Sequence, residues 1–342
     1  MGNWYIEKGP ESDVVISSRA RLARNLEAFP FPIRMSREQE EKVIIQARDA
    51  VLKSSNAMSG QFLFIEIDSL DPVERQALVE KHLVSPNLIE GKRKGAALIS
   101  RDEKISIMIN EEDHLRIQCM FPGLQLMRAW ELCDRIDNLF EEKLDFSYDN
   151  KYGYLTCCPT NMGTGMRASV MLHLPALVMT GYIRQILEAC GKLGIAVRGL
   201  YGENSEASGN MFQISNQVTL GQTEEEIVTG ITNITTQIIE QERVIRKELH
   251  DQNPYRFEDK VFRSMGLLAN SRIMSSEEGL KLLSDVRLGI DMGIIKDINI
   301  ETLNEIMLIT QPASIQKSEG RHLAAEERDI KRAEIIRGKL QK

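Results

Sequence analysis

The chain has 342 residues, 42% of them hydrophobic and 27% charged, which suits two domains with sizeable cores and argues against widespread disorder. Its net charge of −7 argues against a surface built for nucleic acid or an anionic membrane. Five cysteines, two of them adjacent, do not resemble a secreted disulfide framework. Neither a signal peptide nor a membrane-spanning apolar stretch is evident. We therefore expect a cytoplasmic protein with no membrane or direct nucleic acid partner.

The first 250 residues contain patterns of both strands and helices. Helical periodicity predicts helices at residues 37–52, 124–144 and 177–193. Short apolar runs bounded by glycine, proline or charge predict strands at residues 61–67, 95–100, 105–110, 153–157, 197–201 and 211–216.

A long helix should follow, and a helical region after it. Thr223 and Glu226 have the spacing of a capping box, and isoleucines from Ile227 onward recur at helical spacing as a core-facing stripe. Asn253-Pro254 breaks this pattern, and the remaining sequence has almost no strand signal. We therefore predict a lead-in of residues 1–13, an α+β domain of residues 14–253 and an all-helical domain of residues 254–342.

The run Cys158–Ser169 joins a thiol, a glycine-rich turn and an arginine. Gly163 and Gly165 can adopt backbone conformations that side chains forbid, so the loop can approach a ligand closely, and Arg167 can reach that ligand with a forked, permanently charged group. Taken alone, the run is typical of a turn before a helix with an incidental cysteine.

Three further arginine-bearing segments strengthen the functional interpretation. They are Ser17-Ser18-Arg19-Ala20-Arg21, residues 110–116 and Arg198-Gly199-Leu200-Tyr201-Gly202-Glu203. A single arginine is usually a solvated surface charge, but these lie at strand ends beside glycines, where binding sites are often built. Arginines and carboxylates in one cleft would suit a reaction between an anion and a cation.

Several common site types are excluded. The sequence lacks a Walker-type phosphate loop, the protein-kinase motif set, and the spacing of metalloproteases or zinc fingers. We therefore predict no metal site made by protein side chains.

Together, the segments resemble the phosphagen (guanidino) kinase superfamily. Cys158–Asn161 with Gly163–Gly165 resembles that family's signature, residues 110–116 its acidic catalytic motif, residues 198–203 its second glutamate motif and residues 17–21 its first arginine pair. The resemblance covers roughly residues 14–245. It implies an α+β fold: a phosphagen-kinase-like catalytic domain with a mostly antiparallel sheet flanked by helices.

Two departures narrow the resemblance to the bacterial protein arginine kinases. Metabolic phosphagen kinases have a helical domain before the first arginine pair, whereas only sixteen residues precede Ser17 here and the helical region follows the catalytic domain. The segment Arg328-Asp329-Ile330-Lys331-Arg332-Ala333 resembles the phosphoarginine-binding motif of those kinases, which implies an allosteric phosphoarginine site. Arg328 and Arg332 would share a helix face, which alone is typical of an exposed helical surface.

The resemblance implies ATP with Mg²⁺ as phosphoryl donor. Arginine suits the phosphates because it is planar, charged and capable of bidentate contacts. His82 matches a nucleotide-contacting histidine of the family, although alone it is typical of a surface helix. The implied ATP-binding residues are Ser17, Ser18, Arg19, Ala20, Arg21, His82, Arg116, Arg167, Ala168, Ser169, Val170, Met171, Arg198, Gly199, Leu200, Tyr201, Gly202 and Glu203.

The resemblance also implies the acceptor site. Glu112 and Glu203 match the two glutamates that hold the acceptor guanidinium. Full prior deprotonation of a guanidinium by a glutamate would cost on the order of 11–13 kcal/mol, so we expect the proton to leave as the N–P bond forms. We assign Glu112 as the base and Glu203 to orientation. Cys158 is either a small packing residue or an auxiliary thiolate near the guanidinium.

The expected activity is ATP-dependent phosphorylation of arginine side chains in proteins. The alternatives are a metabolic guanidino kinase acting on free arginine and a catalytically silent phosphoarginine-binding adaptor. The resemblance further implies marking of stress-response regulators and damaged proteins for proteolysis. Implied partners are substrates with exposed arginines, a heat-shock repressor, a small zinc-binding activator, an AAA+ unfoldase–protease and a second copy of the chain.

Overall fold

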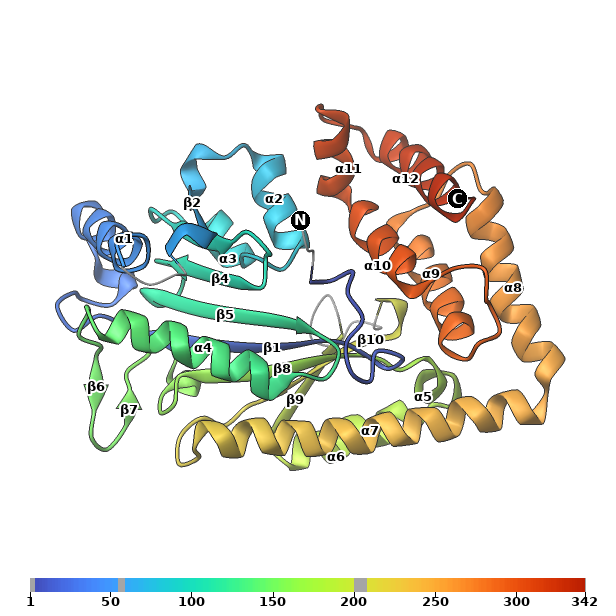
Figure 1. Ribbon diagram of the computed structural model, residues 1–342, viewed down its shortest axis with the longest axis horizontal. Helices are drawn as coiled ribbons and strands as arrows, with labels where there is room; N and C mark the ends of the chain where they lie inside the picture. Colours follow the sequence, from blue (N-terminus) through green and yellow to red (C-terminus); the bar gives the residue numbers. More distant parts are fainter. Residues whose placement is uncertain (1–3, 55–58, 200–207, 342) are drawn as a thin grey trace.

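A computed structural model describes residues 4–54, 59–199 and 208–341 of the protein (Figure 1). Its centre is an eight-stranded sheet in the order β2-β3-β4-β5-β1-β8-β10-β9, in which every neighbouring pair is antiparallel. The strands are β1 (Val15–Arg24), β2 (Phe62–Glu66), β3 (Ala96–Ser100), β4 (Ile105–Ile109), β5 (Leu115–Pro122), β8 (Met166–His173), β9 (Ile195–Gly199) and β10 (Met211–Asn216). Two short strands, β6 (Tyr148–Asp149) and β7 (Gly153–Tyr154), form a separate hairpin.

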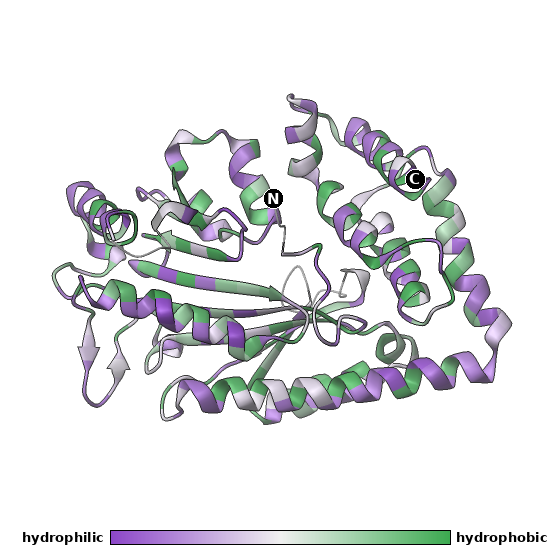
Figure 2. Ribbon diagram, in the orientation of Figure 1, coloured by the Kyte–Doolittle hydropathy of each residue, from purple (hydrophilic) through white to green (hydrophobic). Residues whose placement is uncertain are grey.

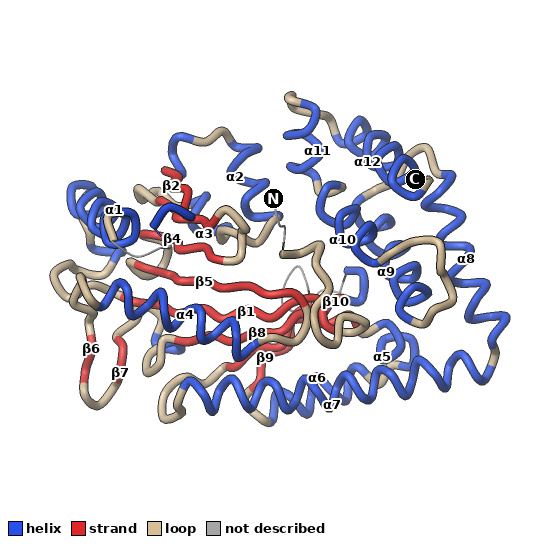
Figure 3. Tube along the Cα trace, viewed as in Figure 1, coloured by secondary structure: helices blue, strands red, loops and turns tan. Residues whose placement is uncertain are grey.

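One face of the sheet packs against helices and forms the largest core. Figure 3 shows α4 (Leu126–Glu141) and the long α7 (Glu224–Gln252) running along this face. Alternate residues of the central strands, such as Ala20, Leu22, Ala168 and Val170, are buried in that core. Three further helices contribute residues to the same core: α1 (Arg37–Leu52), α5 (Pro175–Thr180) and α6 (Ile183–Lys192).

The opposite face carries a smaller lobe next to β3 and β4. It contains α2 (Pro72–Glu80) and α3 (Pro86–Glu90). A second core joins this lobe to the sheet, with Leu83 and Leu88 packed against Ala97, Met108 and Met120. The part of that face that this lobe leaves uncovered carries the candidate functional site.

A third core belongs to the helical C-terminal region. The Asn253 side chain accepts a hydrogen bond from the Arg256 N–H at the start of α8, where α7 ends. The helices are α8 (Pro254–Asn270), α9 (Ser276–Asp291), α10 (Ile300–Ile309), α11 (Pro312–Glu319) and α12 (Ala325–Leu340). Their core consists of residues between Phe257 and Ile336, and Figure 2 shows hydrophobic and hydrophilic residues interleaved along these helices.

The fold class predicted from sequence is confirmed: an antiparallel sheet flanked by helices precedes a helical region. The Thr223–Glu226 capping box and the break at Asn253-Pro254 are present. The predicted helix of residues 177–193 is wrong in one respect, because Gly181, with φ +77°, separates α5 from α6. Among the described residues, no helix is long and apolar enough to cross a membrane.

Candidate active site

Strand register places five arginines on one face of the sheet. Arg21 of β1 lies opposite Arg167 of β8, and Arg19, two residues earlier, lies on the same face. Arg116 of β5 is paired with Ala23, and Arg198 of β9 with Gln213, which is paired in turn with Met171 of β8. The sequence segments that carry these arginines are far apart, and the antiparallel sheet brings them together.

These arginines raise one another's electrostatic energy. Burial and the charges of Arg116 and Arg167 lower the pKa of Arg19 to about 10, and burial with the charges of Arg19, Arg116 and Arg167 lowers that of Arg21. Burial and Arg198 lower the pKa of Arg167, whose Nε is buried without a partner among the described residues. Such a cluster is suited to a bound polyanion.

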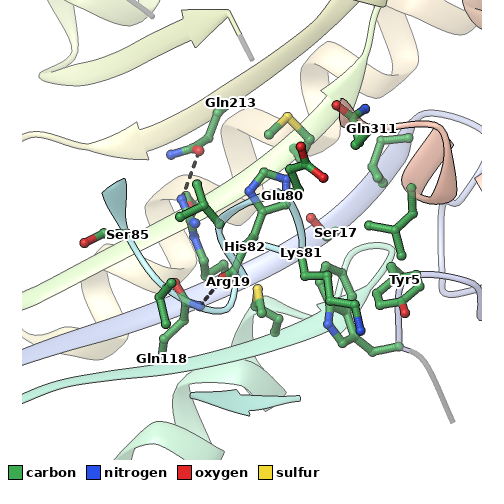
Figure 4. Close-up of a pocket in the computed structure, with 18 of the residues that line it drawn as sticks. Tyr5, Ser17, Arg19, Glu80, Lys81, His82, Ser85, Gln118, Gln213 and Gln311 are labelled. Atoms are coloured by element: carbon green, nitrogen blue, oxygen red, sulfur yellow. Dashed lines mark hydrogen bonds between the residues drawn. The ribbon is translucent and has the colours of Figure 1, made fainter. Parts of the chain in front are cut away.

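A cavity of about 600 Å³ opens beside the arginines. Figure 4 shows Arg19 in it, where its guanidinium donates to Gln213 Oε1 (2.9 Å) and to Ser169 Oγ (3.3 Å). Ser17 and Met171 also line the cavity. The remaining walls come from the N-terminal segment, the small lobe and the helical region, and include Trp4, Tyr5, Glu80, Lys81, His82, Leu280, Met307, Leu308 and Gln311.

His82 faces this cavity from the segment after α2. Its backbone has φ +58°, and its carbonyl accepts a hydrogen bond from Gln118 Nε2 at 2.7 Å (Figure 4). Desolvation by the surrounding protein and the charge of Arg19 lower its pKa to about 4, although the residue as a whole is exposed. The imidazole is therefore neutral at physiological pH and can meet a nucleotide without adding charge.

A second cavity of about 80 Å³ is lined by both carboxylates and arginines, and we call it the acidic cavity. Arg21 and Arg116 line both cavities and so stand between the two, whereas Arg167 lines the smaller one. The carboxylates of the smaller cavity are those of Glu111, Glu112 and Asp113. The pair of cavities can hold an anion and a cation on either side of the same arginines.

The two neighbouring glutamates of the small cavity differ in their contacts. Glu111 is buried and accepts hydrogen bonds from Arg116 (2.8 Å) and Ser85 (2.7 Å). Glu112 is exposed, and its carboxylate receives no hydrogen bond within the described part of the chain. Burial, then the charges of Asp113 and Glu111, raises the pKa of Glu112. Glu112 is thus the carboxylate available to a ligand, and a stronger base than an ordinary glutamate.

The glycine-rich loop is held by contacts that leave no room for side chains. Gly163 (φ +111°) and Gly165 (φ +65°) would place a Cβ 2.5 Å from Thr219 O and 2.6 Å from Ala23 O, respectively. The guanidinium of Arg24, buried against Asp137 at 2.6 Å, also donates to the carbonyl of Thr164 at 2.9 Å. The loop leads into β8, so the interpretation of the run as a turn before a helix is wrong.

Asp113 links the acidic motif to the two adjacent cysteines. Its Oδ1 accepts hydrogen bonds from the Cys157 N–H (2.7 Å) and from Asn25 Nδ2 (2.6 Å). Burial and the Asp113 charge raise the pKa of Cys157 to about 12, so this thiol stays protonated. Cys158 is half-buried, and its Sγ lies 3.0 Å from Thr160 Oγ1. The Cys158 side chain is also near enough to Arg167 to influence the pKa of that arginine.

Several residues assigned to nucleotide binding have side chains on the other face of the sheet. Ala20, Ala168 and Val170 are part of the main core, and Ser18 Oγ donates to Gly123 O at 2.8 Å. Their side chains are directed away from the cavity because neighbouring strand residues alternate between faces. Gly199 ends β9. The remaining predicted positions, Leu200, Tyr201, Gly202 and Glu203, lie outside the described residues.

The predicted phosphoarginine motif lies at the N-terminal half of α12. Arg332 is buried, and its guanidinium donates to Thr310 O (2.9 Å) and Met274 O (2.8 Å). Arg328 is half-buried and donates to Leu323 O at 2.9 Å. Lys331 forms ion pairs with Glu319 and Glu334, both at 3.1 Å. In this arrangement Arg332 holds α12 against its neighbours, and the binding role of residues 328–333 stays a prediction.

Sequence reasoning missed some residues that shape the site. Gln213 fixes Arg19, Glu111 fixes Arg116, and Asp113 fixes the cysteine loop. Glu111 and Asp113 flank Glu112 in sequence, so the acidic run was a signal for them. The sequence contains no comparable signal for the cavity residues of the helical region, because only packing of that region on the sheet brings them there.

Five arginines lie on one face of this antiparallel sheet, and two of them, Arg21 and Arg116, line both a large cavity and a small one that also contains carboxylates. This arrangement is that of a phosphotransferase of the guanidino kinase class. Residues 42–245 match the family described as ATP:guanido phosphotransferase, C-terminal catalytic domain. Residues 254–342 match the protein-arginine kinase McsB C-terminal domain. The chain belongs to the protein-arginine kinase family, and it is an enzyme.

Similar proteins agree over nearly the whole length. A protein-arginine kinase of Bacillus pumilus (strain SAFR-032) is 52% identical over 99% of this chain and 93% of its own. One of Bacillus subtilis (strain 168) is 50% identical over the same shares of both chains.

Solved structures share the fold. A lombricine kinase has a TM-score of 0.62 at 23% identity and covers 70% of this chain and 69% of its own. The duplicated taurocyamine kinase of Schistosoma mansoni with bound transition-state analogue components has a TM-score of 0.61 at 27% identity, covering 69% and 34%.

Proposed function

We propose that the protein transfers the γ-phosphoryl group of ATP to arginine side chains of other proteins. The observation that carries this proposal is that Arg21 and Arg116 line both cavities, while Arg167 stands beside them. A phosphoryl group held by these arginines would lie between a nucleotide in the large cavity and a guanidinium in the acidic one. The full-length relatives named protein-arginine kinase support a protein as the acceptor.

The donor side would act mainly through electrostatics. Arg19, Arg21, Arg116, Arg167 and Arg198 would bind the phosphates and spread the charge of a loose transition state. Their mutual repulsion, seen in the lowered pKa values of Arg19 and Arg167, would be relieved when the phosphates bind. The neutral ring of His82 would contact the nucleotide beyond the phosphates.

The acceptor side would orient a guanidinium and remove its proton. Glu112 would form a charge-assisted hydrogen bond to the guanidinium, and its raised pKa makes it the better base of the described glutamates in the small cavity. The proton would pass to Glu112 as the N–P bond forms. Glu203 would orient the acceptor, and Cys158 would act as an auxiliary group beside Arg167.

We propose that Mg²⁺ enters as its ATP complex. It prefers oxygen ligands and commonly takes them from substrate phosphates and water. Across the described residues, no group of three or more histidine, cysteine, aspartate or glutamate side chains is placed to hold a metal ion. The metal would neutralise part of the phosphate charge, and the arginines would position the phosphates.

A biological role in stress-response proteolysis would follow from the same activity. Phosphoarginine would mark regulators and damaged proteins, and residues 328–333 on α12 would recognise it. This part of the proposal rests on the resemblance of the motif and of the matched C-terminal region.

The reaction is tested by incubating the protein with [γ-³²P]ATP, Mg²⁺ and a basic protein. We expect label on the protein that is lost in acid and kept in base, because a P–N bond hydrolyses when protonated. Peptide mass spectrometry should place the phosphate on arginine. Acid-stable label on serine, threonine or tyrosine, or no label, would contradict the proposal.

A further inference from the structure

The large cavity is not built by the catalytic domain alone. Leu280 of α9, Met307 and Leu308 of α10, and Gln311 before α11 all line it, and we call these four residues the helical wall. In Figure 4, Gln311 lies across the pocket from Ser85 and Gln118, with Arg19 and His82 between them. Three of the four wall residues are apolar, which suits the base and ribose of a nucleotide better than its phosphates.

One edge of the helical wall is anchored to the segment that carries His82. The carboxylate of Glu80, the last residue of α2, accepts hydrogen bonds from the backbone N–H groups of Ala313 (2.7 Å) and Ser314 (2.8 Å). Ser314 Oγ donates to the same carboxylate at 3.0 Å. A carboxylate at the first turn of α11 is favourable because it satisfies free N–H groups and the helix dipole.

The opposite edge is anchored to the sheet. Ser284 of α9 lies 2.8 Å from Nε2 of His173, at the end of β8, and its Oγ accepts a hydrogen bond from Asn210 Nδ2, also at 2.8 Å. Gly209 packs so closely that a Cβ there would lie 3.1 Å from Leu280 O. Asn210 directly precedes Met211, another residue of the cavity. The wall is therefore fixed on two sides to elements that face the nucleotide.

We propose that the helical wall is part of the nucleotide-binding site and that Glu80 is a positioning residue that holds it against the His82 segment. This inference rests on the proposed function, because it takes the large cavity as the ATP site. Tight contact with the base and ribose then requires the helical domain to be seated on the sheet. ATP affinity becomes a property of both domains.

Filling the cavity from the helical side tests the wall directly. In the full-length protein, Leu308→Trp should raise the Kd of a fluorescent ATP analogue and the KM for ATP about tenfold or more, because a larger side chain takes the space of the base. The KM for the protein substrate should change less than about twofold. Leu267→Trp, at a half-exposed position on α8 outside the cavity, is the matched control and should bind like the wild type.

The positioning role of Glu80 is tested by Glu80→Ala. We expect a rise in the KM for ATP of about threefold to tenfold, with kcat at saturating ATP and the KM for protein within about twofold of wild type. Glu90→Ala, at an exposed glutamate of α3, serves as control. A purely structural role would instead lower the thermal midpoint and leave the KM for ATP unchanged.

The outcomes separate the inference from the proposed function. If the wild type binds ATP and Leu308→Trp binds it equally well, the proposed role of the helical wall in nucleotide binding is wrong, while the kinase assignment stands. If the wild type itself fails to bind ATP, both are wrong. An increase in the KM for ATP confined to Leu308→Trp and Glu80→Ala supports the wall and its anchor.

Discussion

The arginine cluster stores unfavourable electrostatic energy in the free enzyme. Desolvation and the charges of Arg19, Arg116 and Arg167 lower the pKa of Arg21. Among the charges that act on this pKa, only that of Glu111 raises it. A site preorganised for a polyanion accepts this cost because the substrate removes it on binding.

Replacing Arg21 should therefore separate stability from binding. We expect Arg21→Met to raise the thermal midpoint of the nucleotide-free protein, because it replaces a half-buried, repelled charge with an uncharged side chain of similar shape. The rise in midpoint on adding ATP, which follows ligand binding to the folded state, should largely disappear. Differential scanning fluorimetry with and without Mg-ATP measures both. Arg263→Met, at an exposed position of α8, should change neither, and a destabilised free Arg21→Met enzyme would contradict the argument.

Glu112 provides a second prediction at this scale. Glu112→Gln should lower kcat by about 10²–10⁴ while the KM for ATP stays near the wild-type value, because the amide cannot take the proton. Steady-state kinetics with both substrates varied gives this result. Near-normal turnover would show that another group is the base.

The pH dependence of the rate follows from the same residue. A base must be ionised, and the pKa of Glu112 is raised, so activity should be lost as pH falls through a value above the ordinary glutamate pKa of about 4.3. Asp113→Asn keeps the Oδ1 acceptor for Cys157 but removes a neighbouring negative charge. It should move the acid limb of kcat/KM to lower pH, and an unmoved limb would mean that Glu112 does not control it.

At the scale of elements, the glycine-rich loop depends on backbone conformations that only glycine adopts without strain. Gly165 and Gly181 both have a positive φ, +65° and +77° respectively. A Cβ at Gly165 would also lie 2.6 Å from Ala23 O, whereas a Cβ at Gly181 would meet no other atom within 4 Å. Gly181→Ala should cost about 1 kcal/mol of unfolding free energy from φ alone. Gly165→Ala should cost more, and only it should lower kcat. Urea unfolding and activity assays test this, and equal costs would remove the role assigned to the close packing.

The strands show what sequence patterns could predict. Short apolar strands such as β3 and β4 were found because both faces are buried and the runs are uniformly hydrophobic. Strands β1, β5 and β8 were not found, since each alternates core residues with arginines and other polar residues of the active site. The pattern that hides these strands is the one that builds the site.

For the candidate site itself, motif resemblance found residues that lie together in the structure, including Arg19, Arg21, Arg116 and Arg167. It assigned whole segments, however, and so included Ser18 and Ala20, whose side chains lie on the core face. Period-two alternation on β1 would have removed both. No local pattern could have indicated the helical wall, because it depends on contacts between residues more than two hundred positions apart, such as Glu80 with Ala313.

At the scale of the whole molecule, the helical region lies beside the catalytic domain and also lines its large cavity. The seam between them contains polar contacts, including the part-buried hydrogen bond from Arg287 Nη2 to Ser12 O at 2.9 Å and the buried contact of Ser284 with His173. Such contacts are costly to leave unmade, which fixes the orientation of the two parts. Under the proposed function, a protein acceptor would approach the small cavity while the helical region contacts the nucleotide.

The choice of acceptor is the central claim, and a competition assay tests it most directly. The enzyme, Mg-ATP, a folded basic protein and free arginine are mixed, with the arginine residues of the protein and free arginine at equal concentration. Phosphoarginine in each fraction is then counted after separation by size. We predict that at least about tenfold more phosphate enters the protein, which corresponds to about 1.4 kcal/mol in transition-state stabilisation. Equal or greater transfer to free arginine would contradict the account and identify a metabolic guanidino kinase.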